Sequence, residues 1–157
     1  MEWVYQSFDE ISGRELYELL KLRVNVFIVE QDCPYAEIDG NDFDAIHITC
    51  KDEQGIAAYT RLLPKGVKYE SPSIGRVIVR EDLRGTGLGH MLMEHAIHQV
   101  VEKWGPSEIF LQAQTHLEDF YKRHGFNTIS EPYKDDGIPH IDMIYPESVA
   151  DKENFTD

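Results

Sequence analysis

The sequence has little cysteine and no long apolar segment. Cys33 and Cys50 are the only cysteines in the chain, far fewer than a disulfide-dependent secreted domain carries, and they form no C-x-x-C pair. No run of roughly 18 uninterrupted apolar residues occurs, and the N-terminus lacks a basic region followed by an apolar stretch. We therefore expect a soluble, cytoplasmic protein without a membrane partner.

Positive charge is also scarce. Lysine and arginine total 15 against 29 aspartates and glutamates, which gives a formal net charge of −14. Such a field repels polyanions and draws cations toward acidic clefts, so nucleic acid is not expected as a partner. The same acidity could equally serve only to keep the protein soluble, and both explanations stay open at this point.

The chain does contain enough apolar residues for one core. Its length is 157 residues and its hydrophobic fraction is 41%, the size and composition of a single compact domain. We expect this domain over residues 1–146 and a polar tail over residues 147–157.

Apolar periodicity and turn residues predict a chain that mixes helices and strands. Ser12 and Glu15 have the spacing of a capping box that opens a helix, and Gly105 before Pro106 ends another. Helices are expected over residues 12–29, 88–104 and 117–124. Strands, most of them antiparallel, are expected over residues 3–8, 45–51, 55–63, 73–79, 109–112, 126–131 and 140–145.

A glycine-rich loop lies between the strand at 73–79 and the helix at 88–104. Its sequence is Arg84-Gly85-Thr86-Gly87-Leu88-Gly89. Glycines let backbone N–H groups approach an anion at the positive end of the helix dipole, and Arg80 and Arg84 add positive charge. The loop therefore predicts a diphosphate site.

Two other nucleotide-binding loops fit this sequence poorly. A Walker A loop ends in Gly-Lys-Ser or Gly-Lys-Thr, but Gly89 is followed by His90 and Met91. A dinucleotide fingerprint needs a third glycine where His90 stands, and a repeated βαβ architecture. A tight turn without a ligand remains open for the loop taken alone.

A second motif follows the glycine loop. Phe120-Tyr121 stands shortly before Gly125-Phe126. With Val77-Ile78-Val79 and the glycine loop, in this order, it resembles the acetyl-CoA signature of the GNAT acetyltransferases. Other segments are similar to the ElaA subgroup of that superfamily, so that the resemblance covers roughly residues 4–145. These segments are Arg23 to Phe27, Val29 to Gln31, Cys33 to Tyr35, Glu37, Asp39, Asp42 and Asp136 to Ile141.

The resemblance implies the GNAT acyl-CoA N-acyltransferase fold, an α/β fold of the α+β kind in which helices flank a mixed, mostly antiparallel sheet. Its parallel strands, at 73–79 and 109–112, would splay apart and admit the pantetheine arm of acetyl-CoA. Gln114 departs from the asparagine that the family often has there, and no metal is expected. The residues implied in cofactor binding are Val77, Ile78, Val79, Arg84, Gly85, Thr86, Gly87, Leu88, Gly89, Gln114, Phe120 and Tyr121.

The resemblance also implies catalytic roles. A backbone N–H near Ile78 or Val79 would polarise the thioester carbonyl. Tyr121 matches the tyrosine that protonates the departing thiolate. Near the sulfur the phenol pKa would be lowered from about 10, or the proton would be shared between the phenol and the sulfur. The attacking ammonium must lose a proton, for which His140 and Glu37 are the candidate acceptors.

The most acidic stretch of the chain is the loop over residues 31–44. Glu37, Asp39 and Asp42 are expected to hold the ammonium group of the acceptor, unless they only form a solvated loop. We thus expect an N-acetyltransferase that moves acetyl from acetyl-CoA to a primary amine, a small cation or a lysine-like group, in a ternary complex. The alternative is a non-catalytic acyl-CoA sensor or interaction module, and a homodimer is compatible with either.

Overall fold

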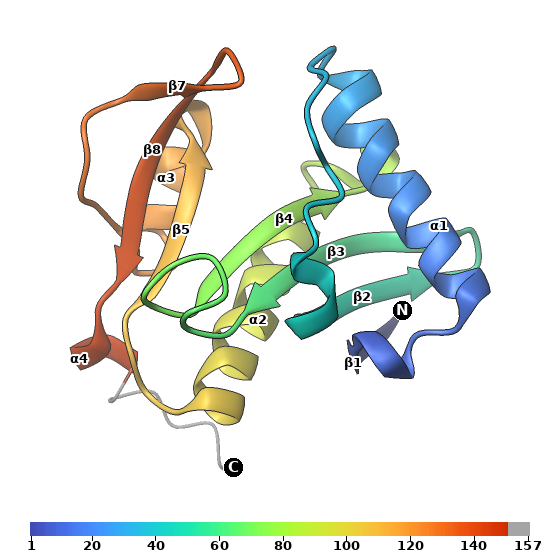
Figure 1. Ribbon diagram of the computed structural model, residues 1–157, viewed down its shortest axis with the longest axis horizontal. Helices are drawn as coiled ribbons and strands as arrows, with labels where there is room; N and C mark the ends of the chain where they lie inside the picture. The colour runs from blue at the N-terminus through green and yellow to red at the C-terminus, as the bar shows by residue number, and fades with distance from the viewer. Residues whose placement is uncertain (151–157) are drawn as a thin grey trace.

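The computed structural model describes residues 1–150 and shows one mixed sheet with helices packed on its two faces (Figure 1). The strand order is β1-β2-β3-β4-β5-β8-β6, and β7 pairs with β8. Every pair is antiparallel except β4 with β5, which confirms the predicted sheet. The strands are β1 Glu2–Ser7, β2 Ile46–Asp52, β3 Gly55–Leu63, β4 Ser73–Val79, β5 Ile109–Gln114, β6 Asn127–Thr128, β7 Tyr133–Asp135 and β8 Ile138–Tyr145.

The helices begin and end close to the predicted residues. The Ser12 hydroxyl accepts the Glu15 N–H at 3.1 Å and the Glu15 carboxylate accepts the Ser12 N–H at 3.0 Å, which confirms the capping box. The first helix continues directly into a π-helical turn, Asn25–Glu30. The α-helices are α1 Gly13–Val24, α2 Leu88–Trp104, α3 Glu118–Lys122 and α4 Glu147–Ala150, and short 3-10 turns lie at Phe8–Glu10, Asn41–Asp44, Glu81–Leu83 and Thr115–Leu117.

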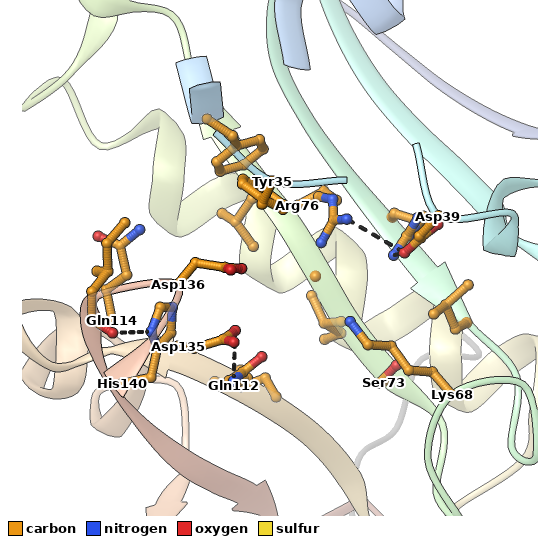
Figure 2. A pocket seen from close by; sticks show the side chains of 18 of the residues that line it. Tyr35, Asp39, Lys68, Ser73, Arg76, Gln112, Gln114, Asp135, Asp136 and His140 are labelled. Atoms are coloured by element: carbon orange, nitrogen blue, oxygen red, sulfur yellow. Dashed lines mark hydrogen bonds and ion pairs between the residues drawn. The ribbon is translucent and has the colours of Figure 1, made fainter. Parts of the chain in front are cut away.

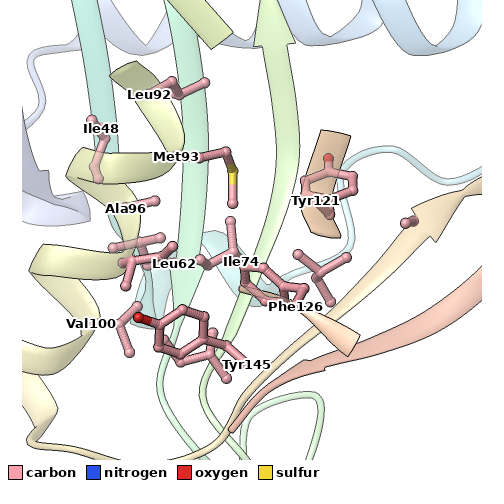
Figure 3. Close-up of a cluster of buried hydrophobic side chains, with 14 of the residues drawn as sticks. Ile48, Leu62, Ile74, Leu92, Met93, Ala96, Val100, Tyr121, Phe126 and Tyr145 are labelled. Atoms are coloured by element: carbon pink, nitrogen blue, oxygen red, sulfur yellow. The ribbon is translucent and has the colours of Figure 1, made fainter. Parts of the chain in front are cut away.

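The main core lies between α2 and the sheet (Figure 3). Leu92 and Val100 lie on one stripe of α2 and are fully buried together with Ile48 of β2, as an amphipathic helix on a sheet requires. In Figure 1, α1 lies in front of β2 and β3 while α2 lies behind the sheet. The packing under α1 is a smaller buried cluster of Leu19, Tyr59 and Ile78. None of the helices within residues 1–150 is both long and apolar enough to cross a membrane.

The parallel strands β4 and β5 pair at one point and then separate. They pair at Ser73 and Phe110, where the Phe110 N–H donates to the Pro72 carbonyl at 2.9 Å. Beyond this point they diverge and divide the sheet into two halves, β1–β4 and β5–β8 (Figure 1). The β3–β4 register is irregular, and Arg76 in β4 has a φ of 51°, as in a bulge that bends a strand. Main-chain groups of both strands therefore face the gap without a strand partner.

The structure differs from the prediction near the C-terminus. The strand expected over residues 126–131 is only two residues long, and β7 was not predicted. β7 exists because Asp136 and Gly137 have positive φ values of 50° and 80° and close a two-residue turn with β8. Part of the expected tail is helical: α4 buries Ala150 completely in the main core. Residues 151–157, the rest of that tail, lie outside the described residues.

Candidate functional site

The splay between β4 and β5 opens two cavities. One, of about 760 Å³, follows the glycine loop and is called here the glycine-loop cavity. The other, of about 500 Å³, is bordered by the β7–β8 hairpin and is called the hairpin cavity. The cavities share six lining residues, Phe27, Gln31, Val77, Gln114, Leu117 and Tyr121. They therefore meet where the two strands part.

The glycine loop has the backbone geometry that an anion site needs. Gly85 and Gly87 have φ values of 81° and 91°, which side chains rarely adopt, and Gly87 is the N-cap of α2. The first hydrogen bond of α2 runs from the Met91 N–H to the Gly87 carbonyl. The N–H groups that precede it at the helix start have no helical acceptor and can bind an anion.

The two arginines near the loop are already paired with carboxylates. Arg84 makes two hydrogen bonds to Glu30, at 2.8 and 3.0 Å, and its Nε donates to the Val79 carbonyl. Arg80 pairs with Asp52 and Asp82. The positive charge that the two arginines add near the loop is thus partly neutralised by carboxylates, and the backbone N–H groups of the loop remain as donors to an anion.

Most residues predicted to bind the cofactor line the glycine-loop cavity. The exceptions are Thr86, whose hydroxyl donates to the Leu83 carbonyl at 2.5 Å, and Leu88, whose side chain is 4% exposed and belongs to the core. His90 was not predicted but lines this cavity, with its Nδ1 2.8 Å from Nε2 of His124. Those that line it are Val77, Ile78, Val79, Arg84, Gly85, Gly87, Gly89, Gln114, Phe120 and Tyr121.

Tyr121 lies at the junction of the two cavities. Its side chain is part of the main core at 5% exposure (Figure 3), and within residues 1–150 its hydroxyl makes no hydrogen bond. Burial raises the pKa of the phenol well above its usual value, contrary to the expected lowering. The Tyr121 hydroxyl thus keeps its proton at physiological pH and can donate it.

Gln114 and His140 face each other across paired strands. They are opposite in the β5–β8 register, and both line the hairpin cavity. Nδ1 of His140 lies 2.7 Å from the Ile138 carbonyl, which fixes the tautomer with hydrogen on Nδ1 and leaves Nε2 as an acceptor. Gln114 reaches Gln31 at 3.4 Å. His140 can therefore act as a base at this cavity.

Glu37 and Asp42 are committed to ion pairs inside the protein. Glu37 is 2% exposed; its carboxylate pairs with Arg23 and Arg76 at 2.6 Å each and accepts the Tyr35 hydroxyl at 2.7 Å. Asp42 is 6% exposed and pairs with Arg23 at 2.6 Å. Neither lines the hairpin cavity. The expectations that Glu37 is a base and that both acids bind the acceptor are corrected, because both carboxylates are buried in ion pairs and neither residue lines the cavity.

Asp39 is also paired, although it does line the hairpin cavity. Both of its oxygens accept from Arg61 at 2.9 Å, and Arg76 contacts it at 3.3 Å. Desolvation is the largest single influence and opposes its ionisation, but Arg61, the Asn41 N–H and Arg76 together outweigh it and hold the pKa of Asp39 well below its usual range. Glu37, Asp39 and Asp42 thus form a neutralised network rather than a free negative surface.

Three charged groups of the hairpin cavity were missed by sequence reasoning. Lys68 comes from the loop before β4, Asp135 is the last residue of β7, and Asp136 lies in the β7–β8 turn. Figure 2 shows them on opposite sides, with Asp135 and Asp136 beside Gln112 and His140. The Asp-Gly turn was a local signal for the hairpin, but no local signal marks Lys68.

A sequence model of the acetyltransferase (GNAT) domain matches residues 15–146. The chain therefore belongs to the GNAT acetyltransferase family. It is 43% identical over 145 residues to protein ElaA of Escherichia coli strain K12, a match that covers 91% of this chain and 95% of that protein.

Solved structures give the same result. The crystal structure of Escherichia coli ElaA has a TM-score of 0.85 at 41% identity and covers 92% of this chain and 99% of its own. An acyl-CoA N-acyltransferase from Pseudomonas aeruginosa gives the same four values. An aminoglycoside 6′-N-acetyltransferase complexed with coenzyme A shares the fold at 14% identity and a TM-score of 0.68, over 90% of this chain and 95% of that one. The predicted GNAT fold and the resemblance to ElaA are confirmed.

Proposed function

We propose that this chain is an acetyl-CoA-dependent N-acetyltransferase that transfers an acetyl group directly to a primary amine in a ternary complex. The observation that carries the proposal is the meeting of two cavities at Tyr121, one bordered by the glycine loop and the other by His140. Donor and acceptor can enter from different sides and meet at this junction, as direct transfer requires.

The residues present fit the cosubstrate. The N–H groups of the glycine loop and of the first turn of α2 can bind a diphosphate. The main-chain groups that the splay leaves without a strand partner, on β4 and β5, can pair with the amides of a pantetheine arm as an added strand would. When bound, acetyl-CoA supplies an activated acetyl group.

His140 accepts a proton in the reaction and Tyr121 donates one. Nε2 of His140 accepts a proton from the ammonium of the acceptor, directly or through water. Tyr121 keeps its proton at neutral pH because burial raises its pKa, and it gives this proton to the departing sulfur. A main-chain N–H of Ile78 or Val79 polarises the acetyl carbonyl.

The acceptor is a small cationic amine or a lysine-like group. The hairpin cavity, at about 500 Å³, has the size of a small-molecule site. Asp39 lines it but is paired with Arg61. The carboxylates of Asp135 and Asp136 line the cavity and join no ion pair within residues 1–150, so they can attract an ammonium in place of Glu37, Asp39 and Asp42.

Calorimetric titration with acetyl-CoA tests the cosubstrate. The wild type is expected to bind, and Gly87→Glu is expected to lose binding, because a carboxylate there obstructs and repels the diphosphate. Gly105→Glu is the matched control: this glycine has a φ of 82° and ends α2 at the opposite terminus. Absence of binding by the wild type, or equal loss in both variants, contradicts the assignment of the glycine loop.

Tyr121→Phe tests the chemistry. Free-thiol release with an amine acceptor is expected to fall on the order of 100-fold in kcat, the usual contribution of a general acid, while acetyl-CoA still binds. Tyr17→Phe on α1, with Tyr17 at 72% exposure, controls for loss of a hydroxyl. Unchanged transfer in Tyr121→Phe removes the catalytic assignment and favours an acyl-CoA sensor.

A further inference from the structure

Lys68 is a cation of the hairpin cavity with no carboxylate partner. It belongs to the loop between β3 and β4, and it enters no ion pair with any residue of the described range 1–150. Its one close interaction is with the ring of Tyr69, 5.5 Å from the ammonium to the centroid. Desolvation lowers the pKa of Lys68, and the guanidinium groups of Arg76 and Arg61 lower it further, although the charges of Asp39 and Asp135 partly oppose the shift. An anion placed here would relieve both effects.

Asp135 and Asp136 carry negative charge on the cavity wall that faces Lys68. Asp135 accepts a hydrogen bond from Gln112 at 3.1 Å, and neither aspartate joins an ion pair within the described residues. The Asp136 carbonyl accepts the Cys33 thiol at 3.1 Å, which ties the turn to the loop over residues 31–44. In Figure 2 the carboxylates of both aspartates point into the cavity toward the wall that carries Lys68.

We propose that the acceptor is an amine that also carries a carboxylate: Lys68 binds the carboxylate, while Asp135 and Asp136 attract the ammonium that is to be acetylated. This inference rests on the proposed function. Unpaired charges of opposite sign on facing walls complement a zwitterion, whereas a diamine would place a cation against Lys68 and a dicarboxylate would place an anion against the turn. The arrangement thus selects by repulsion as well as by attraction.

The carboxylate would bind near Lys68, and the amine would react at the junction of the two cavities. The separation of these two points sets the distance between the amine and the carboxylate of the acceptor. Ser73, beside Lys68 in Figure 2, lies where β4 and β5 join, while Val77 lies at the junction of the cavities. Ser73 and Val77 are four positions apart along β4, so the surroundings of Lys68 and the junction of the cavities are separate points of one strand. An α-amino acid is too short to span this interval. The structure therefore favours an ω-amino acid, or the side-chain amine of a free diamino acid.

The proton and bond changes balance for such an acceptor. The ammonium gives one proton to His140, the nitrogen forms a bond to the acetyl carbon, and the carbon–sulfur bond breaks. Tyr121 protonates the thiolate and is reprotonated by the second proton that leaves the nitrogen. The products are the N-acetylated amino acid, free coenzyme A and one proton, which His140 releases to solvent.

The test compares three acceptors that differ only at the distal end: 5-aminopentanoate, pentylamine and 1,5-diaminopentane. With acetyl-CoA saturating, kcat/KM of the wild type is expected to be highest for 5-aminopentanoate and lowest for the diamine. Lys68→Met is expected to lower the value for 5-aminopentanoate about tenfold, as for one charge-assisted hydrogen bond, and to leave pentylamine unchanged. Lys68→Glu is expected to prefer the diamine.

Lys65→Met is the matched control, because Lys65 lies in the same loop, is exposed and does not line the cavity. It is expected to retain the wild-type order of acceptors. A second series, from glycine to 6-aminohexanoate, is expected to rise in kcat/KM as the chain lengthens. Equal preference for the three acceptors in the wild type, or an unchanged preference in Lys68→Met, overturns the inference.

Binding of 5-aminopentanoate in the presence of coenzyme A separates this inference from the proposed function. Binding that Lys68→Met weakens, without turnover by the wild type, supports the acceptor site and contradicts transfer. Turnover of all three amines at equal rates supports transfer and contradicts the acceptor site. Failure of both binding and turnover overturns both.

Discussion

Two groups of carboxylates lie near the hairpin cavity, and they differ in their partners. Glu37, Asp39 and Asp42 come from one loop and are held by the guanidinium groups of three arginines, Arg23, Arg61 and Arg76. Asp135 and Asp136 come from a turn on the other half of the sheet and join no ion pair within residues 1–150. The first group is built into the fold, whereas the second is open to a ligand.

The difference shows that the number of acidic residues in a segment does not measure the charge that it offers. A buried carboxylate paired with a guanidinium contributes to position and specificity of the fold, and little of its field reaches a ligand. The network instead holds the loop over residues 31–44 against β3 and β4 through Arg61 and Arg76. A carboxylate without a partner keeps its full attraction for a cation.

The largest expected effect comes from breaking the paired group. Arg23 is completely buried between Glu37 and Asp42, so Arg23→Met leaves two buried carboxylates without their shared cation. The free energy of unfolding should fall by about 3–5 kcal/mol, measured by chemical denaturation. Lys21→Met, an exposed change on the same helix, is the control. A loss below about 1 kcal/mol would show that the network is solvated, as a surface ion pair is.

The opposite result is expected for the unpaired group. Asp135→Asn together with Asp136→Asn should leave the free energy of unfolding within about 0.5 kcal/mol of the wild type, since no ion pair is broken. The kcat/KM of the double variant for a cationic amine should fall about tenfold, which is equivalent to about 1.4 kcal/mol. Glu2→Gln with Glu18→Gln removes the same charge far from the cavity. Equal losses in the two double variants would assign the effect to net charge alone.

The elements that border the glycine-loop cavity could be predicted because their signals are local. The strand over residues 73–79, the glycine loop and the helix over residues 88–104 follow one another in the chain, so their order fixes their geometry. Tyr121, which lines both cavities, was proposed from the family resemblance. Its pKa direction was not, because burial depends on a core assembled from distant elements.

The charged lining of the hairpin cavity could not be predicted in the same way. The partners of Glu37 come from α1 and β4, far along the chain, and no periodicity marks such pairs. Lys68 lies in a loop whose path over the cavity is set by tertiary packing. The β7–β8 hairpin left a local trace in Asp136 and Gly137, but three-residue strands are too short for an alternating pattern to be read.

The smallest expected effect is the pH dependence of the paired group. The pKa of Asp39 is lowered in the folded protein, so its contribution to stability is present above its unfolded pKa, about 3.9, and is lost as pH falls through the folded value. Between about pH 5 and about pH 3 the wild type should therefore lose more unfolding free energy than Asp39→Asn, by about 1 kcal/mol. Asp44→Asn, which removes an exposed carboxylate of the same loop, is the control. Parallel pH curves for the wild type and Asp39→Asn would mean that Arg61 does not hold this carboxylate in solution, and the contrast between the two groups of acids would disappear.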